Sequence, residues 1–154
     1  MTRYVLERRI VVPAPLPETF AFFEDPRNLA RITPPWLHFR ITTSGGIDMR
    51  RGTVIRYQIR WLGIPISWTT TISEYDPPGV FVDEQSSGPY RFWRHRHTFE
   101  AVEDGTAVGD RVEYALPLGW AGRLAHALVV RRQLEGIFEY RTRILGEIFR
   151  PTAR

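Results

Sequence analysis

The chain has 154 residues, of which 21 are arginine, none is lysine and 17 are acidic, so its net charge is +4. Its 43% hydrophobic and 25% charged residues are typical of an ordinary globular domain, which excludes a disordered or collagen-like chain. Cysteine is absent, which excludes disulfides, thiolate catalysis, zinc–thiolate sites and iron–sulfur clusters.

Hydropathy and charge together limit the protein's expected location and partners. No stretch approaches the roughly 18 consecutive apolar residues that a membrane-spanning helix needs, and residues 3–12 mix arginines with apolar side chains, unlike a signal peptide. We therefore expect one cytoplasmic domain over residues 1–154, without integral membrane association. The arginines are scattered and acidic residues lie near many of them, so we expect no nucleic-acid partner. A weak contact with a membrane surface, and assembly as a monomer or a homodimer, stay open.

The N-terminal residues predict one strand followed by two short helices. The strand covers residues 3–12 and ends at Pro13, because proline lacks the backbone N–H that a central strand needs. The helices cover residues 17–26 and 27–32, and the second ends before Pro34. Together they form a short helical insertion between strands.

Strands dominate the middle of the chain. Their predicted bounds are 36–43, 53–61, 66–75, 80–85, 91–102 and 107–117. The connections between them are short, and short connections imply antiparallel neighbours. The sequence therefore predicts one antiparallel sheet of six or seven strands.

A single long helix is predicted at the C-terminus. Between residues 120 and 149 the apolar side chains recur at every third or fourth position, and a helix of this length extends about 45 Å. It is the only predicted element large enough to cover one face of the sheet.

Two hairpins allow that covered face to be assigned. A two-residue turn at Asp104-Gly105, and a connection over residues 62–65, give each strand residue a defined partner. The expected pairs are Phe99–Asp110, His97–Val112, His95–Tyr114 and Trp93–Leu116 in one hairpin, and Trp61–Ile66, Ile59–Trp68 and Tyr57–Thr70 in the other. Each hairpin then has one charged, solvent-exposed face and one mainly apolar face.

Four polar side chains interrupt the apolar face of the second hairpin. They are His95, His97, Asp110 and Tyr114. Buried polar groups need hydrogen-bond partners or water, and 9 Phe, 6 Tyr and 5 Trp are many for a filled core of this size. The pattern therefore predicts a cavity that holds water or a ligand, rather than a fully packed core.

Several motifs resemble those of a known superfamily. They are Val11-Val12-Pro13-Ala14-Pro15, Thr33-Pro34-Pro35-Trp36, Phe81-x-Asp83-x-Gln85-x-x-Gly88-Pro89-Tyr90-x-x-Trp93-x-His95-x-His97-x-Phe99, Asp110-Arg111-Val112-x-Tyr114 and Ile137-Phe138-x-Tyr140-Arg141. This set resembles the SRPBCC superfamily of START-related helix-grip proteins, and more narrowly its bacterial ligand-binding, polyketide cyclase/dehydrase-like subgroup. The resemblance covers essentially the whole chain.

The resemblance implies an α+β helix-grip fold. In this fold a curved antiparallel β-sheet wraps around a long C-terminal helix, and two short helices follow the first strand. A hydrophobic pocket for a lipid-like or polycyclic, polyketide-like molecule is also implied. No reaction is implied, because the superfamily includes carriers, sensors, cyclases and hydrolases.

We expect the ligand to contact both the sheet and the long helix. The predicted contact residues are Tyr57, Trp68, Phe81, Asp83, Gln85, Trp93, His95, His97, Tyr114, Leu128 and Arg131. On the helix, Arg131 either extends to the rim or offers a cation to a ligand head group. We expect His126 at the surface or at the rim.

The pair His95-x-His97 with Asp110 admits three interpretations. Two imidazoles and a carboxylate are sufficient for a non-haem metal site, and they can also act as a general acid–base pair. The interpretation we prefer is a hydrogen-bonded patch that orients the polar end of an apolar ligand. Since the facing strand offers no firm third ligand, we expect neither a metal nor a cofactor.

The sequence thus favours binding of a hydrophobic small molecule between the sheet and the C-terminal helix over catalysis. The alternative is a cyclase or dehydratase that acts on a carbonyl substrate. Its candidate catalytic residues are His95, His97, Asp110 and Tyr114.

Overall fold

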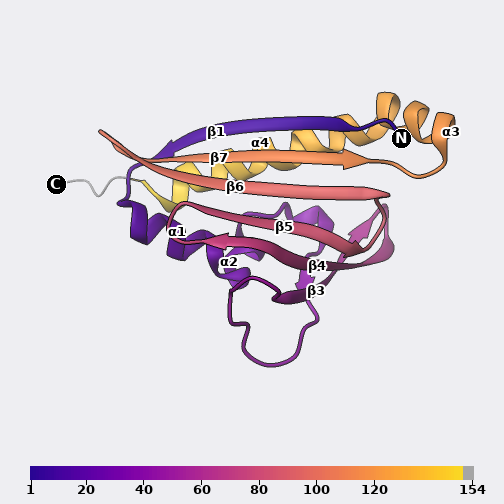
Figure 1. The fold of residues 1–154 in the computed structure, drawn as a ribbon. Helices are drawn as coiled ribbons and strands as arrows, with labels where there is room; N and C mark the ends of the chain where they lie inside the picture. Colours follow the sequence, from indigo (N-terminus) through magenta and orange to yellow (C-terminus); the bar gives the residue numbers. More distant parts are fainter. Residues whose placement is uncertain (151–154) are drawn as a thin grey trace.

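A computed structural model describes residues 1–150 of the chain (Figure 1). Its strands are β1 (Tyr4–Val12), β2 (Arg40–Ile41), β3 (Val54–Trp61), β4 (Ile64–Asp76), β5 (Val80–Ser87), β6 (Phe92–Val102) and β7 (Gly105–Ala115). Its helical elements are α1 (Leu16–Glu24), α2 (Pro26–Arg31), the 3-10 turn η1 (Pro35–Leu37), α3 (Gly119–Ala125), the π-helical turn η2 (His126–Val130) and α4 (Arg131–Ile148).

All seven strands form one antiparallel sheet in the order β1-β7-β6-β5-β4-β3-β2. The first and last strands, β1 and β7, are therefore neighbours. The sheet curves, and the C-terminal helical segment runs along the β1–β7 side of it (Figure 1). This is the α+β helix-grip fold that the sequence predicts, with the two short helices directly after β1.

Two hydrophobic clusters hold the helices on the inner face of the sheet. In the first, Leu134 and Phe138 of α4 pack against Leu6 of β1 and Val112 of β7. In the second, Phe20 of α1 packs against aromatic residues of β5 and β6. Residues of both clusters line one cavity between the helices and the sheet.

Proline and aspartate define the short helices. Both α1 and α2 carry a proline in the first turn, where the missing N–H is not needed. Asp25 caps α2 by accepting a hydrogen bond from the backbone N–H of Arg27 at 3.0 Å. The chain therefore starts a second helix at this point instead of extending the first.

The hairpin between β3 and β4 turns at Leu62-Gly63. Both residues have positive φ angles, 49° and 79°, as a type I′ turn requires. The predicted four-residue connection is therefore wrong, and Tyr57 pairs with Trp68 rather than with Thr70. Because the pairing moves by two residues, every side chain keeps its predicted face.

The hairpin between β6 and β7 also differs from the prediction by two residues. Its turn lies at Glu103-Asp104, and Gly105 is the first residue of β7. A Cβ atom at Gly105, whose φ is 142°, would lie 2.0 Å from the carbonyl oxygen of Val12. The glycine is thus required by the close approach of β1 and not by the turn itself.

The corrected register changes which polar residues face each other across β6 and β7. His97 lies opposite Asp110, and His95 lies opposite Val112 rather than Tyr114. The predicted pairing of His97 with Val112 is wrong for the same reason. The two histidines and Asp110 still share the inner face.

Two further predicted elements are wrong in part. Residues 36–43 form η1 and the two-residue β2 instead of a strand, because Pro35 starts a 3-10 turn and His38 is left-handed with a φ of 47°. The C-terminal helix contains the π-helical turn η2, whose i→i+5 bonding rotates the preceding residues relative to α4. No helix in residues 1–150 is long and apolar enough to cross a membrane.

Candidate functional site

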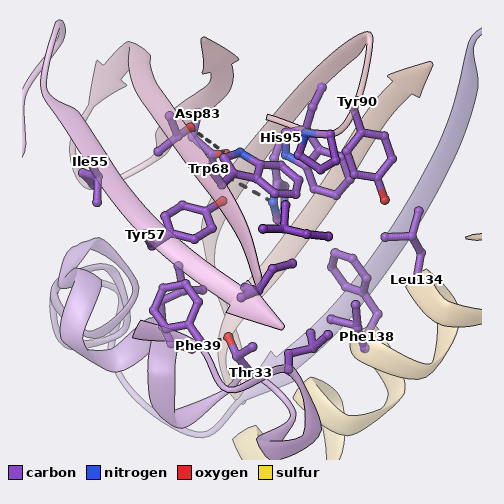
Figure 2. Close-up of a pocket in the computed structure, with 18 of the residues that line it drawn as sticks. Thr33, Phe39, Ile55, Tyr57, Trp68, Asp83, Tyr90, His95, Leu134 and Phe138 are labelled. Atoms are coloured by element: carbon purple, nitrogen blue, oxygen red, sulfur yellow. Dashed lines mark hydrogen bonds and ion pairs between the residues drawn. The ribbon is translucent and has the colours of Figure 1, made fainter. Parts of the chain in front are cut away.

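A cavity of about 440 Å³ lies between the sheet and the helices. Strands β3 to β6 form one side, and α1, α2 and the α3–α4 segment form the others. Figure 2 shows Leu134 and Phe138 of α4 on the helix side, with Tyr57 and Trp68 on the sheet side. Most lining side chains are apolar or aromatic, which is the usual character of a small-molecule pocket.

Four aromatic side chains form a continuous part of the lining, which we call the aromatic wall: Tyr57, Trp68, Tyr90 and Trp93. The Tyr57 and Trp68 rings stack with centroids 5.7 Å apart. Trp68 meets Trp93 edge-on at 5.1 Å, and Trp93 lies 4.8 Å from Tyr90. Because each ring is fixed by its neighbours, the wall presents rigid apolar surface to the cavity.

Five polar side chains, here called the His–Asp cluster, lie on the sheet side of the cavity: Asp83, His95, His97, Asp110 and Arg141. Strand register creates the cluster, because Asp83 of β5 lies opposite His95 of β6, and His97 lies opposite Asp110 of β7. Arg141 reaches it from α4, with Nη2 3.4 Å from Asp110 Oδ1. All but Asp83, which is about a fifth exposed, are buried.

The two imidazole rings of the cluster stack on each other, with centroids 3.7 Å apart, between the two carboxylates. His97 Nε2 donates to Asp83 Oδ2 at 2.7 Å, and His95 Nε2 donates to Asp110 Oδ1 at 2.8 Å. The other nitrogens are more distant: His97 Nδ1 lies 3.5 Å from Asp110, and His95 Nδ1 lies 4.0 Å from Asp83. Each carboxylate therefore faces one nitrogen of each ring.

Burial and neighbouring charges set the protonation states of the cluster. Burial alone would raise the pKa of Asp110, but Arg141 and His95 hold that pKa below its ordinary value. Burial would also raise the pKa of Asp83, but the hydrogen bond from His97 and the nearby charges lower it. Burial and the neighbouring His95 lower the pKa of His97 to about 4. Near pH 7 both carboxylates are ionised and His97 is neutral.

Some hydrogen-bonding capacity beside the cavity is unused within residues 1–150. His97 Nδ1, Arg141 Nε and Trp68 Nε1 are buried and have no hydrogen-bond partner in that part of the chain. An unpaired buried polar atom costs about 1–3 kcal/mol. The cluster can therefore hold the polar end of a ligand, move a proton or, through Asp83 and the two histidines, offer three donors to a metal ion.

The structure places many of the predicted contact residues in the cavity lining. These are Tyr57, Trp68, Phe81, Asp83, Trp93, His95 and His97. Gln85 lies behind the lining, where its side-chain amide donates to the carbonyl of Tyr90 at 2.7 Å and accepts from the N–H of Tyr90 at 3.0 Å. Gln85 therefore positions a residue of the aromatic wall.

Three other predicted contact residues lie away from the cavity. Tyr114 hydrogen-bonds through Oη to His126 Nε2 at 2.7 Å, and His126 is buried rather than at the surface. Leu128 is 65% exposed, and Arg131 is exposed and pairs with Glu135. The expectation for Leu128 assumed an uninterrupted α-helix, whereas η2 rotates Leu128 relative to α4. Arg131 is the first residue of α4 and is not among the buried residues of that helix.

Two lining residues, Arg141 and Tyr90, were not among the predicted contacts. Arg141 occupies the buried stripe of α4 together with Leu134, Phe138 and Leu145. A single cation on such a stripe is a signal for a buried anion. Tyr90 follows Pro89 in a loop, and the hydrogen bonds with Gln85 hold its backbone in place. No periodic pattern in the sequence reveals this contact.

The family model described as "Polyketide cyclase / dehydrase and lipid transport" matches residues 12–138. Since this match covers most of the chain, the protein belongs to that family, and the resemblance to the SRPBCC superfamily is confirmed. Among curated proteins, no sequence matches the chain.

Solved structures with similar folds support the same architecture. The protein TTHA0849 from Thermus thermophilus is 19% identical, with a TM-score of 0.70 and 95% of each chain covered. CV1439 from Chromobacterium violaceum is 13% identical, with a TM-score of 0.75 and coverage of 96% of this chain and 98% of that one. The Zhui aromatase/cyclase from Streptomyces sp. R1128 is 16% identical, with a TM-score of 0.67 and 96% of each chain covered. At these identities the similarity establishes the fold.

Proposed function

We propose that this protein binds an apolar small molecule in the cavity between the sheet and α4, with the polar end of the molecule at the His–Asp cluster. The observation that carries this proposal is a cavity of about 440 Å³ with a mainly apolar lining and one polar side. Small-molecule sites typically combine an apolar pocket of this size with a few polar groups that fix orientation. The family description, which includes lipid transport, supports the same assignment.

The composition of the lining suggests the class of ligand. The aromatic wall favours flat or polycyclic apolar surface, because rigid rings such as Trp68 and Trp93 stack well on such groups. Within residues 1–150, the His–Asp cluster has an unpaired donor at Arg141 Nε and an unpaired acceptor at His97 Nδ1, and the aromatic wall has an unpaired donor at Trp68 Nε1. A hydroxyl both donates and accepts, and it avoids the repulsion that Asp83 and Asp110 would exert on a carboxylate. We therefore propose a lipid-like or polycyclic alcohol or phenol.

Native mass spectrometry of freshly purified protein tests for a ligand that stays bound. We expect an added mass of a few hundred daltons that is lost on mild activation. The same spectrum gives the oligomeric state, monomer or homodimer. A ligand-free spectrum, together with no binding of added apolar alcohols, would contradict the proposal.

A matched pair of variants tests the position of the ligand. Ile66→Trp adds bulk inside the cavity, whereas Ser67→Trp adds the same bulk on the exposed face of the same strand. We expect Ile66→Trp to weaken binding of the fluorescent probe N-phenyl-1-naphthylamine at least tenfold and Ser67→Trp to leave it unchanged. Equal affinities in both variants would place the ligand elsewhere.

Acid–base catalysis, of the cyclase or dehydratase type, is the second candidate function. It is favoured by one observation: the imidazole of His97 donates from Nε2 to the carboxylate of Asp83 at 2.7 Å beside an apolar cavity. Such a pair can take up a proton from a carbon next to a carbonyl group. We expect dehydration of a β-hydroxy ketone to be lost in His97→Gln while binding of the fluorescent probe persists. If the wild-type protein gives no turnover above buffer, the candidate is removed.

A contact with an anionic membrane surface is a third proposal, and it concerns residues 118–132. The exposed apolar side chains of this segment are Leu118, Trp120, Leu124, Leu128 and Val129. The segment also carries three arginines, and no acidic residue occurs between residues 115 and 134. Apolar side chains flanked by arginine are typical of helices that lie in a membrane interface. Leu118 also lines the cavity, so such a contact would bring the cavity next to lipid.

Vesicle co-sedimentation tests this contact. We expect binding to vesicles of phosphatidylglycerol and phosphatidylcholine, loss of binding at high salt, and no binding to phosphatidylcholine alone. Trp120→Ser should weaken binding, whereas Trp36→Ser, an exposed tryptophan of the η1 turn outside this segment, should not. Absence of binding at low salt would exclude the contact.

A further inference from the structure

We propose that Asp83, His95 and His97 form a binding site for one divalent first-row transition-metal ion on the sheet side of the cavity. Asp110 supports the site through its hydrogen bond with His95, and Arg141 pairs with Asp110 from α4. This departs from the sequence-based expectation of no metal, because the third ligand is Asp83 of β5 and not Asp110 of β7. The inference does not rest on the apolar-ligand function.

Strand geometry brings the three donor groups together. His95 and His97 are alternate residues of β6 and share its inner face, and Asp83 lies directly opposite His95 on β5. One donor atom of each residue lies within 4.8 Å of the others. Donors bound to one ion at about 2.0–2.2 Å lie about 3.0–3.4 Å apart. The 2.7 Å from His97 Nε2 to Asp83 and the 4.0 Å from His95 Nδ1 to Asp83 bracket this range.

In each ring, the nitrogen that would not bind the metal faces the carboxylate of Asp110. His95 Nε2 donates to Asp110 at 2.8 Å, and His97 Nδ1 lies 3.5 Å from the same oxygen. Metal-bound histidines usually donate their second N–H to a carboxylate, which fixes the ring and directs the other lone pair at the metal. The arrangement of His95 and Asp110 already has this form, with His95 Nδ1 directed toward the Asp83 side.

His97 supplies an independent observation. Its Nδ1 is buried and has no hydrogen-bond partner in residues 1–150. When Nε2 of a neutral imidazole binds a metal, the proton moves to Nδ1, and here that N–H would point at Asp110. Metal binding therefore gives a partner to an atom that otherwise has none.

The charges of the cluster suit a divalent cation. Asp83 and Asp110 supply two carboxylates to the cluster, and Arg141 supplies one guanidinium. Two nitrogens and one oxygen are donors that Fe²⁺, Co²⁺, Ni²⁺ and Zn²⁺ accept, whereas Ca²⁺ and Mg²⁺ prefer oxygen alone. All three protein ligands line the cavity, so further coordination positions face the space that a small molecule would occupy.

Titration calorimetry on tag-free, full-length protein freed of metal with EDTA tests the site. We expect Co²⁺ and Zn²⁺ to bind with a stoichiometry of one per chain and Ca²⁺ to give no heat of binding. Failure of both Co²⁺ and Zn²⁺ to bind at micromolar protein concentrations would overturn the proposal.

Variants separate the direct ligands from the supporting carboxylate. We expect Asp83→Asn and His97→Gln to weaken Zn²⁺ binding by at least about 100-fold, and Asp110→Asn to weaken it about 10- to 100-fold. His38→Gln, which changes an exposed histidine, should bind as the wild type does. Circular dichroism checks that each variant is folded. Unchanged affinity in a folded Asp83→Asn protein would overturn the site.

X-ray absorption at the zinc edge of the wild-type complex keeps the test valid if a variant fails to fold. We expect the outer-shell scattering of two imidazoles and a first shell without sulfur. A spectrum with fewer than two imidazoles would overturn the assignment. Binding of N-phenyl-1-naphthylamine by metal-free protein is measured in parallel, so failure of the metal site and failure of the apolar-ligand proposal are distinguished.

Discussion

Arg141 of α4 places its Nη2 3.4 Å from Oδ1 of Asp110 in β7, and both side chains are less than a tenth exposed. Within residues 1–150 this is the one ion pair that joins α4 to the sheet. Removing one partner of a buried pair leaves the other charge without compensation. The pair therefore fixes the helix above the cavity and keeps Asp110 ionised beside His95.

We expect Arg141→Met to lower the free energy of unfolding by about 3 kcal/mol, because methionine fills similar volume but leaves Asp110 buried without its cation. Urea denaturation monitored by circular dichroism measures the change. Arg132→Met, which removes an exposed arginine of the same helix, serves as the control and should stay close to the wild type. A wild-type stability for Arg141→Met would show that the pair contributes nothing to the helix–sheet contact.

The buried contact between His126 and Tyr114 predicts a pH dependence. His126 stacks on Tyr4 at 3.5 Å and bonds to Tyr114, and its burial, with a smaller effect of Arg131, lowers its pKa below the ordinary 6.5. As the pH falls below 6.5 the unfolded state takes up a proton that the folded state does not, so stability decreases.

Urea denaturation at a series of pH values from 7 to 5 checks this dependence. We expect His126→Phe, which has no titrating group at this position, to lose less stability over the range than the wild type. His38→Gln replaces an exposed histidine and should keep the wild-type slope. Parallel curves for the wild type and His126→Phe would mean that His126 titrates normally in the folded protein.

Much of the fold follows from periodicity in the sequence. Alternation in β6 and β7 assigns His95, His97 and Asp110 to the inner face, and this assignment survives the two-residue error in register because a strand repeats every two residues. The error itself comes from reading Gly105 as a turn residue. Its actual role, the approach to Val12, depends on a strand more than 90 positions away in the sequence, so local turn chemistry does not reveal it.

The candidate site was predictable only in part. The residue types of the cluster follow from the motifs, but the choice of Asp83 as the partner of His97 depends on the pairing of β5 with β6 and on its exact register. The positions of Leu128 and His126 depend on the π-helical turn, and no residue in that turn differs in kind from those of an ordinary α-helix. Their exposure and burial therefore came from the structure alone.

The close approach of Gly105 to β1 predicts a strong effect of a single methyl group. A Cβ atom at this position would lie 2.0 Å from the backbone oxygen of Val12, and the φ of 142° disfavours any L side chain. We expect Gly105→Ala to lower the melting temperature by many degrees and the free energy of unfolding by about 2–4 kcal/mol. Gly46→Ala is the control, because nothing lies within 4 Å of its Cβ position. Equal melting temperatures in the two variants would show that β1 can move away without cost.

Leu134 is buried and Leu128 is exposed, so substitutions at these two positions test which face of the C-terminal helical segment borders the cavity. Leu134 is 4% exposed, packs in the cluster of Leu6 and Val112 and lines the cavity, whereas Leu128 is 65% exposed. We expect Leu134→Ala to lower the free energy of unfolding by about 3 kcal/mol, since it removes buried methyl groups next to existing space. Leu128→Ala should change it by less than about 0.5 kcal/mol. Urea denaturation gives both values, and probe titration should show altered affinity for N-phenyl-1-naphthylamine only in Leu134→Ala. An altered probe affinity in Leu128→Ala, with none in Leu134→Ala, would place the binding site on the outer face of the helix.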